Sequence, residues 1–183
     1  VSRTGQARIS DYLSGLKDLT GSSYHVKRIY EAIIKGGTFG VGIGEADTKF
    51  TGLPLPHTDS IFAVIVEETG FFGALGVMIL YVLLLWRGMV IAKRAPDQLG
   101  SLISFGLTSW IALEAFLNIS VIVGLFPFAG NALPLISYGG SSMIASMTAL
   151  GIVMNVARRS VMKETAERSQ TSAIVDLRGR DWR

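Results

Sequence analysis

Three long apolar stretches dominate the pattern along the chain, and shorter polar segments separate them. They cover residues 60–86, 99 to about 126, and 136–157. Residues 69–86 of the first stretch carry no charge, the second stretch carries only Glu114, and the third carries none. A helix that crosses a bilayer needs roughly 20 apolar residues, so each stretch is long enough to span one. The pattern therefore predicts an all-α, polytopic integral membrane protein.

A shorter apolar stripe precedes the first span. Its members recur at helical spacing and are Val26, Ile29, Tyr30, Ile33 and Ile34. Gly36 and Gly37 follow, which is typical of a helix end. An amphipathic helix next to membrane spans either lies in the plane of the interface or packs on the protein's own loops, and the pattern favours neither.

We expect three regions along the chain. Residues 1–57 form a loop with the short amphipathic helix, residues 58–157 hold the spans, and residues 158–183 form a tail. From Val161 onward the tail has mixed charge and no apolar period, which predicts disorder. The chain starts with Val1 and has no signal-peptide pattern, so we expect a fragment or a processed piece of a longer protein. The expected spanning helices are about 59–86, 99–126 and 136–157.

The composition agrees with a membrane protein and excludes several kinds of site. Of the 183 residues, 49% are hydrophobic and the mean hydropathy is +0.44, which is too apolar for an ordinary soluble domain. The chain has no cysteine, so it has neither a disulfide nor a Cys-based metal site. Its two histidines, His25 and His57, lack paired spacing, and we expect no zinc site. We expect no nucleic-acid partner.

The charges of the loops predict the orientation. The loop between the first two spans holds Arg87, Lys93, Arg94 and Asp97. The loop 124–135 has no charge, and the tail is rich in arginine. Because short positive loops stay in the cytoplasm, we expect the first loop and the C-terminus inside and loop 124–135 outside. The start of the first span, with Asp59, is then on the outer face.

The most informative polar feature is His57-Thr58-Asp59 at the start of the first span, with Glu67 and Glu68 two turns later. Charged groups near lipid are costly, so they tend to persist where they do chemistry, bind an ion or hold a partner. The structural alternative is that Asp59 caps the helix by accepting hydrogen bonds from free backbone N–H groups. In a straight helix, Asp59 lies about 15 Å beyond the uncharged part, at the outer membrane border. That position suits chemistry on a lipid headgroup.

Glycines and a lysine before Asp59 offer a place for an anion. Residues 37–44 contain Gly37, Gly40, Gly42 and Gly44, but they match no dinucleotide or Walker motif. Such a loop could turn backbone N–H groups toward an anionic group. Lys49 follows, ten residues before Asp59. A lone lysine is usually solvated, but one that leads into this helix could bind phosphate.

The second and third spans carry polar groups of their own. Glu114 lies in mid-membrane with Asn118 one turn later on the same face, and contacts that hold helices together are favoured over chemistry for this pair. The third stretch begins with Ile136-Ser137-Tyr138-Gly139-Gly140-Ser141-Ser142. This run either offers hydrogen bonds to a ligand or lets helices pack closely, and local physics favours neither.

Several segments together resemble the C-terminal part of the SEDS family, the membrane proteins FtsW, RodA and SpoVE of cell shape, division and sporulation. Between Tyr24 and Arg159 the similar segments are, in order, KFTGLPLPHTDSIFAVIVEETGFFGAL, RAPDQLG, LNISVIVGLFPFAGNALPLISYGGSSM and NVARR. The order and spacing of HTD and PLISYGGSS are highly specific. The RAPD loop and the LNISVIVGLFP segment are more similar to FtsW than to RodA.

The resemblance implies the last three helices of a ten-helix fold and the extracytoplasmic loop before them. It implies a peptidoglycan glycosyltransferase of the bacterial inner membrane that polymerises lipid II, with Asp59 as general base. Lys49, the glycine-rich loop or a divalent cation (Mg²⁺ or Mn²⁺) would stabilise the pyrophosphate leaving group, and Lys49 is preferred. A class B penicillin-binding protein and other division or elongation proteins are the implied partners. The residues expected to contact the substrate are Lys49, His57, Thr58, Ser137, Tyr138, Ser141 and Ser142.

Three positions depart from the family pattern. The family commonly reads LPEAHTD, whereas Leu55 stands here in place of the glutamate; Glu114 replaces a usual glutamine, and Ser60 a common phenylalanine. None of these changes removes Asp59. Two other functions stay open, a lipid II flippase in which the acids form an ion pathway and a non-catalytic division scaffold. Because the chain lacks much of the implied cavity, we expect it to be inactive alone.

Overall fold

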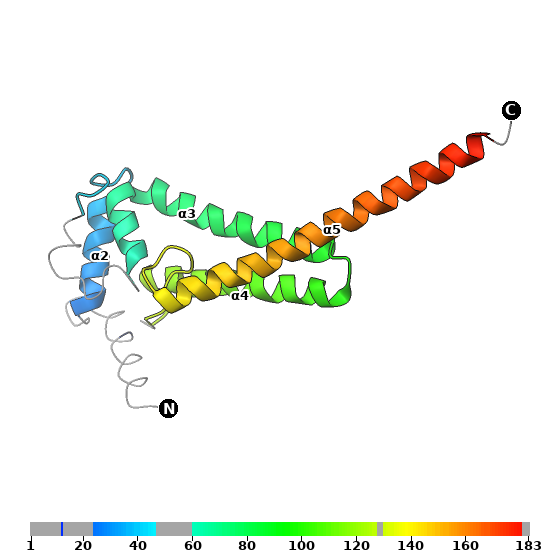
Figure 1. Cartoon of the computed structure of the whole chain (residues 1–183). Helices are drawn as coiled ribbons and strands as arrows, with labels where there is room; N and C mark the ends of the chain where they lie inside the picture. Colours follow the sequence, from blue (N-terminus) through cyan, green and yellow to red (C-terminus); the bar gives the residue numbers. More distant parts are fainter. Residues whose placement is uncertain (1–11, 13–23, 47–59, 128–129, 181–183) are drawn as a thin grey trace, which may run out of the picture. The chain divides into compact units, whose positions relative to one another are not determined.

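The computed structural model describes Tyr12 and residues 24–46, 60–127 and 130–180, and within these residues all regular structure is helical (Figure 1). The predicted all-α fold is therefore confirmed. The helices are α2 (Tyr24–Gly36), α3 (Ile61–Lys93), α4 (Gln98–Ile122) and α5 (Gly140–Arg180). The chain divides into two compact units, the first formed by Val1–Leu83 with Ile111–Ser146 and the second by Leu84–Trp110 with Met147–Arg183.

Three of the helices are long and apolar enough to cross a membrane. They are α3, α4 and the part Gly140–Ala166 of α5. Many of their apolar side chains are exposed, among them Leu80, Leu102 and Ile144. Such a surface is costly in water and is favourable against lipid or further helices. The prediction of three spanning helices is confirmed, and the chain is part of a multi-pass membrane protein.

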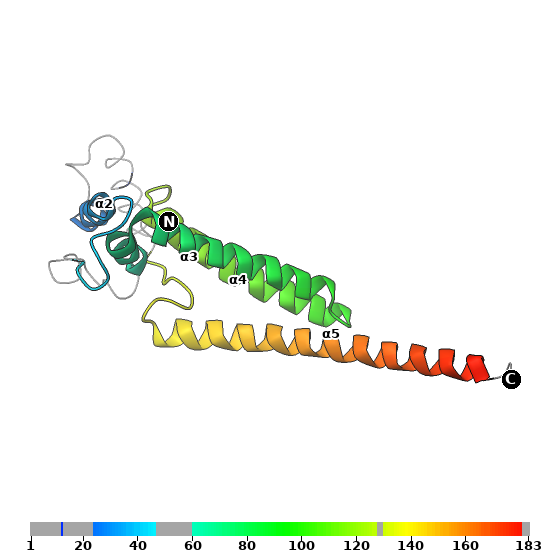
Figure 2. The same cartoon turned by 90° about the horizontal axis from the view of Figure 1, so that it is seen from above.

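α3 contains a sharp break at Gly70, where φ is 68° and ψ is −163°. This backbone conformation is open almost only to glycine. Residues 61–69 run beside α2 in both views, and the rest of α3 leaves in a different direction (Figures 1 and 2). α2 and the first segment of α3 share an apolar core, which contains Ile29, Ala32, Phe62, Ala63 and Val66.

The break bears on two expectations from the sequence. α2 packs on the first segment of α3 through Ile29, so the structure favours packing on the protein itself, although Ile34 of the same stripe is 77% exposed. The prediction that Asp59 lies about 15 Å beyond the uncharged part, at the outer membrane border, assumes that residues 59–69 continue the line of the span. The break at Gly70 contradicts that assumption, because the segment before it does not continue that line.

The helix ends also differ from the predicted ones. α4 ends at Ile122, short of the expected residue 126, because Gly124 turns the chain with a φ of 85°. α5 begins at Gly140, later than the expected residue 136. Residues 134–136 instead form a turn, in which the N–H groups of Ile136 and Ser137 donate to the carbonyl of Leu133.

The prediction of a disordered tail is wrong, because α5 continues as a helix to Arg180. The lack of an apolar period was a poor guide to this segment, which is rich in the strong helix formers arginine, lysine, glutamate, methionine and alanine. Glu164 and Arg168 lie one turn apart and form an ion pair at 2.7 Å, which supports an exposed helix.

In the second unit a short turn joins α3 to α4. Asp97 caps α4, because its Oδ2 accepts a hydrogen bond from the N–H of Gly100 at 2.9 Å. The two helices approach closely at Gly88, where an added Cβ would lie 2.3 Å from Oγ1 of Thr108. Small residues permit this kind of close packing between membrane helices.

Candidate functional site

The glycine-rich segment after α2 packs its backbone directly on the break in α3. The N–H of Val41 donates to the carbonyl of Glu67 at 2.9 Å. The N–H of Gly42 donates to the carbonyl of Glu68 at 3.1 Å. A helix that breaks leaves carbonyl groups without intrahelical partners, and these two bonds supply them.

Only glycine fits at the closest contacts of this packing. A Cβ on Gly40 would lie 2.1 Å from the carbonyl oxygen of Glu68, and a Cβ on Gly70 would lie 2.4 Å from the nitrogen of Gly40. Both glycines also have positive φ. The rings of Phe39 and Phe72 meet beside them, with their centroids 5.5 Å apart. The glycines therefore serve the close approach of two backbones.

This packing overturns the anion-binding interpretation for the centre of the segment. The N–H groups of Gly40, Val41 and Gly42 all donate to carbonyls, that of Gly40 to the carbonyl of Gly36 at 2.7 Å. Each backbone N–H is a single donor, so these groups have none left for a phosphate in this conformation. Of the three predicted sources of positive charge, the centre of the glycine-rich loop is therefore excluded.

Ser60, the residue directly after Asp59, is the N-cap of α3. Its carbonyl accepts hydrogen bonds from the N–H of Ala63 at 3.0 Å and of Val64 at 3.4 Å, and the residue is fully buried. Serine is among the preferred N-cap residues. The cap position is thus filled without Asp59, which weakens the interpretation of Asp59 as a helix cap. Four predicted site residues lie outside the described part of the chain, namely Lys49, His57, Thr58 and Asp59.

The two acids before the break differ in exposure. Glu67 is fully buried, whereas Glu68 is half-buried. Both belong to the first segment of α3, and the uncharged spanning part follows the break at Gly70. The acidic and the spanning parts of α3 are therefore separate segments, so these carboxylates need not lie on the line of the span.

A second group of polar side chains tethers the loop between α4 and α5 to the helices of the first unit. The hydroxyl of Tyr81, on α3, donates to the carbonyl of Pro134. Nδ2 of Asn118, on α4, donates to the carbonyl of Asn131. Buried phenol and amide groups need partners of this kind. Asn118 therefore holds this loop on α4, and its expected role between helices stays a prediction.

Glu114 lies one turn before Asn118 on α4. Its Oε2 is buried and accepts no hydrogen bond within the part of the chain that the structure describes. A carboxylate oxygen in such surroundings is costly. Tyr81, the donor to the carbonyl of Pro134, was not predicted from the sequence. A single tyrosine in an apolar stretch cannot be distinguished there from an ordinary core residue.

The hydroxyl-rich run before and at the start of α5 divides into a buried and an exposed part. Ser137 is 3% exposed, and its Oγ accepts a hydrogen bond from the N–H of Leu133 at 2.6 Å. This bond closes the turn around Leu135, so the structure gives Ser137 a structural role. The side chains left open to a ligand are those of Tyr138, which is 85% exposed, Ser141 and Ser142.

Among the described residues, no group of three or more histidines and acids could hold a metal ion. His57 and Asp59 lie outside those residues. Mg²⁺ or Mn²⁺ at the site therefore stays a prediction.

The family model and the similar proteins all point to the same family. The family model of FtsW, RodA and SpoVE, described as "Cell cycle protein", matches residues 1–162. The chain is 44% identical over 153 residues to the stage V sporulation protein E of Bacillus subtilis, covering 84% of this chain and 42% of that protein. It is 40% identical over 152 residues to the probable peptidoglycan glycosyltransferase FtsW of a Geobacter species (strain M18), covering 83% and 41%. The chain thus spans about two fifths of the length of these relatives.

Two solved structures are similar as well. A chain in a structure of a peptidoglycan synthase complex, concerned with polymerization and crosslinking, has a TM-score of 0.66 and 30% identity, covering 87% of this chain and 43% of that one. The rod shape determining protein RodA of Thermus thermophilus, solved with one aspartate replaced by alanine, has a TM-score of 0.56 and 35% identity, covering 69% and 39%.

Proposed function

The chain belongs to the FtsW, RodA and SpoVE family of cell cycle proteins, and on this premise we propose that it is the catalytic C-terminal part of a peptidoglycan glycosyltransferase. The observation that carries the proposal is the match over most of the chain to relatives named peptidoglycan glycosyltransferases. The substrate is lipid II, which the protein polymerises into glycan strands during division or elongation.

In this reaction Asp59 acts as general base. It accepts the proton of the 4-hydroxyl of the acceptor N-acetylglucosamine as that oxygen bonds to C1 of the donor N-acetylmuramic acid. The bond from C1 to the undecaprenyl pyrophosphate breaks, the pyrophosphate leaves with the electron pair, and the anomeric centre inverts. The leaving group is already good, so one carboxylate is enough and positive charge near the pyrophosphate is the second need. Lys49, or a divalent cation, supplies that charge.

Two features of the first unit support a site at the start of α3. Ser60 fills the N-cap position, so the adjacent Asp59 is available for another role. The first segment of α3 is held on one side by α2 and at its end by the glycine-rich segment. A catalytic group needs such a rigid support. Tyr138 and Ser141 are exposed and are proposed to contact the same substrate.

The proposed setting is the bacterial inner membrane, with Asp59 on the outer face and the C-terminus in the cytoplasm. Arg87 and Lys93 near the end of α3 and Arg94 in the turn after it support this orientation. A class B penicillin-binding protein is the proposed partner, since a similar chain occurs in a peptidoglycan synthase complex. Because the chain spans about two fifths of its relatives, we propose that it is inactive alone.

The test of the reaction uses the native full-length protein, purified with its cognate class B penicillin-binding protein and supplied with labelled lipid II. Product is separated by gel, and lipid II movement across vesicles is measured in parallel. We expect glycan polymer. Movement of lipid II without polymer would favour the flippase. The flippase is the second candidate because Glu67 and Oε2 of Glu114 are buried. If the protein shows neither polymer formation nor lipid II movement, the division scaffold is the remaining candidate.

A further inference from the structure

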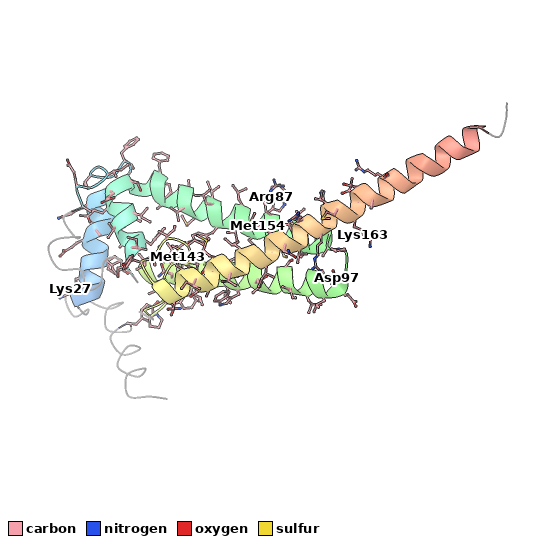
Figure 3. The ribbon with its side chains drawn as sticks, in the orientation of Figure 1. Lys27, Arg87, Asp97, Met143, Met154 and Lys163 are labelled. Atoms are coloured by element: carbon pink, nitrogen blue, oxygen red, sulfur yellow. The ribbon has the colours of Figure 1, made fainter. Side chains whose placement is uncertain are left out.

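A shallow hollow of about 590 Å³ lies on the second unit, where the turn between α3 and α4 meets α5. Arg94 and Pro96 line it from the turn. From α5 it is lined by Ser160, Lys163, Glu164 and Arg168. Figure 3 labels Lys163 on α5 and Asp97 at the end of the turn.

Two hydrogen bonds join the walls of the hollow. Ser160 Oγ donates to the carbonyl of Arg94 at 2.6 Å. Lys163 Nζ donates to the carbonyl of Pro96 at 3.4 Å. Both bonds connect α5 to the turn, so they hold the two walls of the hollow together.

The hollow is positively charged. Its only carboxylate within the described residues is that of Glu164, which pairs with Arg168 at 2.7 Å. Arg94 and Lys163 have no acidic partner in the described part of the chain. Two cations that share a hollow repel each other, and an anion between them removes that cost. A guanidinium fork and an ammonium group both suit phosphate oxygens.

Both walls follow shortly after the uncharged runs of the two membrane helices. The uncharged part of α3 ends at Trp86, whose ring lies 6.0 Å from the guanidinium of Arg87, and such residues are typical of the membrane interface. Arg94 follows about 12 Å along the chain at 1.5 Å per residue. On α5 the uncharged run ends at Ala157, and Lys163 follows within two turns.

We propose that this hollow binds the phosphodiester headgroup of an anionic glycerophospholipid from the surrounding membrane. Arg94 and Lys163 bind the phosphate oxygens. The acyl chains lie along the apolar side of α5, where Met154 is 70% exposed (Figure 3). A lipid is favoured over free phosphate because its chains hold the headgroup at this level. The site is separate from the proposed glycosyl transfer and does not depend on it.

The test is native mass spectrometry of the full-length protein in detergent, titrated with phosphatidylglycerol or with phosphatidylcholine. The hollow variant carries both Arg94→Gln and Lys163→Gln. The matched control is Arg158→Gln with Arg159→Gln, which removes two exposed charges from α5 outside the hollow. Both double variants lose the same net charge, so a difference between them reports the position of the charges.

We expect the wild type to prefer phosphatidylglycerol, and the hollow variant to bind it at least about tenfold more weakly than the control does. Equal weakening in both variants, or none in either, would overturn the proposal. Displacement of the lipid by inorganic phosphate alone would overturn the assignment to a lipid. If the double variant does not fold, Lys163→Gln alone replaces it, and unchanged lipid binding by that variant would equally overturn the proposal.

Discussion

At the residue scale, two buried side chains fix the loop that leads into α5. Tyr81 comes from α3 and Asn118 from α4, and each donates a hydrogen bond to a carbonyl of the loop. Leu133, at the centre of the same loop, is fully buried. Because the loop continues into Tyr138 and the start of α5, these bonds also hold the exposed hydroxyls of that run in place.

Replacing Tyr81 by phenylalanine tests this tether. Tyr81→Phe leaves the carbonyl of Pro134 without its donor, so we expect a loss of about 1–2 kcal/mol in stability. We also expect faster amide hydrogen exchange in residues 130–137. Tyr138→Phe is the matched control, since Tyr138 is 85% exposed and its hydroxyl should not affect unfolding. Thermal unfolding in detergent measures both, and an equal effect of the two substitutions would contradict the tether.

Glu114 offers a test that separates a structural role from an ion pathway. Its Oε2 is buried and lacks a hydrogen bond among the described residues. Glu114→Gln keeps the shape and removes the charge, so we expect stability to be unchanged or raised by up to about 2 kcal/mol. Polymer formation should be retained. Loss of all activity in a folded Glu114→Gln protein would instead indicate that a titratable carboxylate is needed, as in the flippase.

Spacing alone predicted that Glu114 and Asn118 share a face of one helix, because that follows from the helical repeat. The partners of the buried donors could not be predicted in this way. Tyr81 and Pro134 are 53 residues apart in the sequence, and only the folded unit brings them together. For the same reason the hydrogen bond between the N–H of Leu133 and Oγ of Ser137 could not be predicted from spacing.

At the element scale, the break in α3 is the feature that most affects the site. It separates a short segment with two acids from a long apolar segment that can span the membrane. Gly40 and Gly70 make the break possible, because each lets the backbone of the other's segment approach. The start of α3, next to Asp59, is therefore positioned by α2 and the glycine-rich segment as well as by the core that it shares with the spanning part.

Gly70→Ala should disrupt this arrangement. Its Cβ would lie 2.4 Å from the nitrogen of Gly40, and alanine does not tolerate the backbone angles found there. We expect a loss of at least about 2–3 kcal/mol, seen as a lower melting temperature in detergent. Gly76→Ala is the control within the same helix, since its Cβ would meet nothing within 4 Å. That change should be neutral or stabilise by up to about 1 kcal/mol, and equal melting of the two variants would contradict the role of Gly70.

The three spans could be predicted because bilayer thickness sets their length and lipid sets their composition. The break could not, since glycine is frequent in membrane helices and the contact that requires it comes from Gly40, earlier in the chain. The long extension of α5 was missed for a different reason. The lack of an apolar period indicates that a helix is not packed, but it does not exclude one with high helix propensity.

At the scale of the whole molecule, the orientation in the membrane decides which chemistry each end can meet. The charges of the short loops predict that the turn at Asp97 lies inside and the loop before α5 outside. The proposed transfer needs lipid II at the outer end, and the proposed lipid site lies at the inner end. The proposed glycosyl transfer therefore depends on this orientation.

Labelling of single cysteines tests that orientation, because this chain contributes no cysteine of its own. Leu125 lies in the loop before α5 and Arg159 lies on α5, and both are exposed. In a protein without other cysteines, a membrane-impermeant maleimide should label Leu125→Cys in intact spheroplasts. Arg159→Cys should react only after permeabilisation. The reverse pattern would contradict the orientation and place Asp59 on the wrong side for lipid II polymerisation.

The most direct test of the central claim is the initial rate of glycan polymer formation by the native full-length protein with Asp59→Asn. Asparagine caps a helix about as well as aspartate does, but its amide cannot accept the proton of the attacking hydroxyl. A base role predicts a rate at least about 100-fold below the wild type with an unchanged melting temperature. Asp97→Asn, at the cap of α4, should keep the wild-type rate. A rate for Asp59→Asn close to the wild type would contradict the assignment of Asp59 as the base.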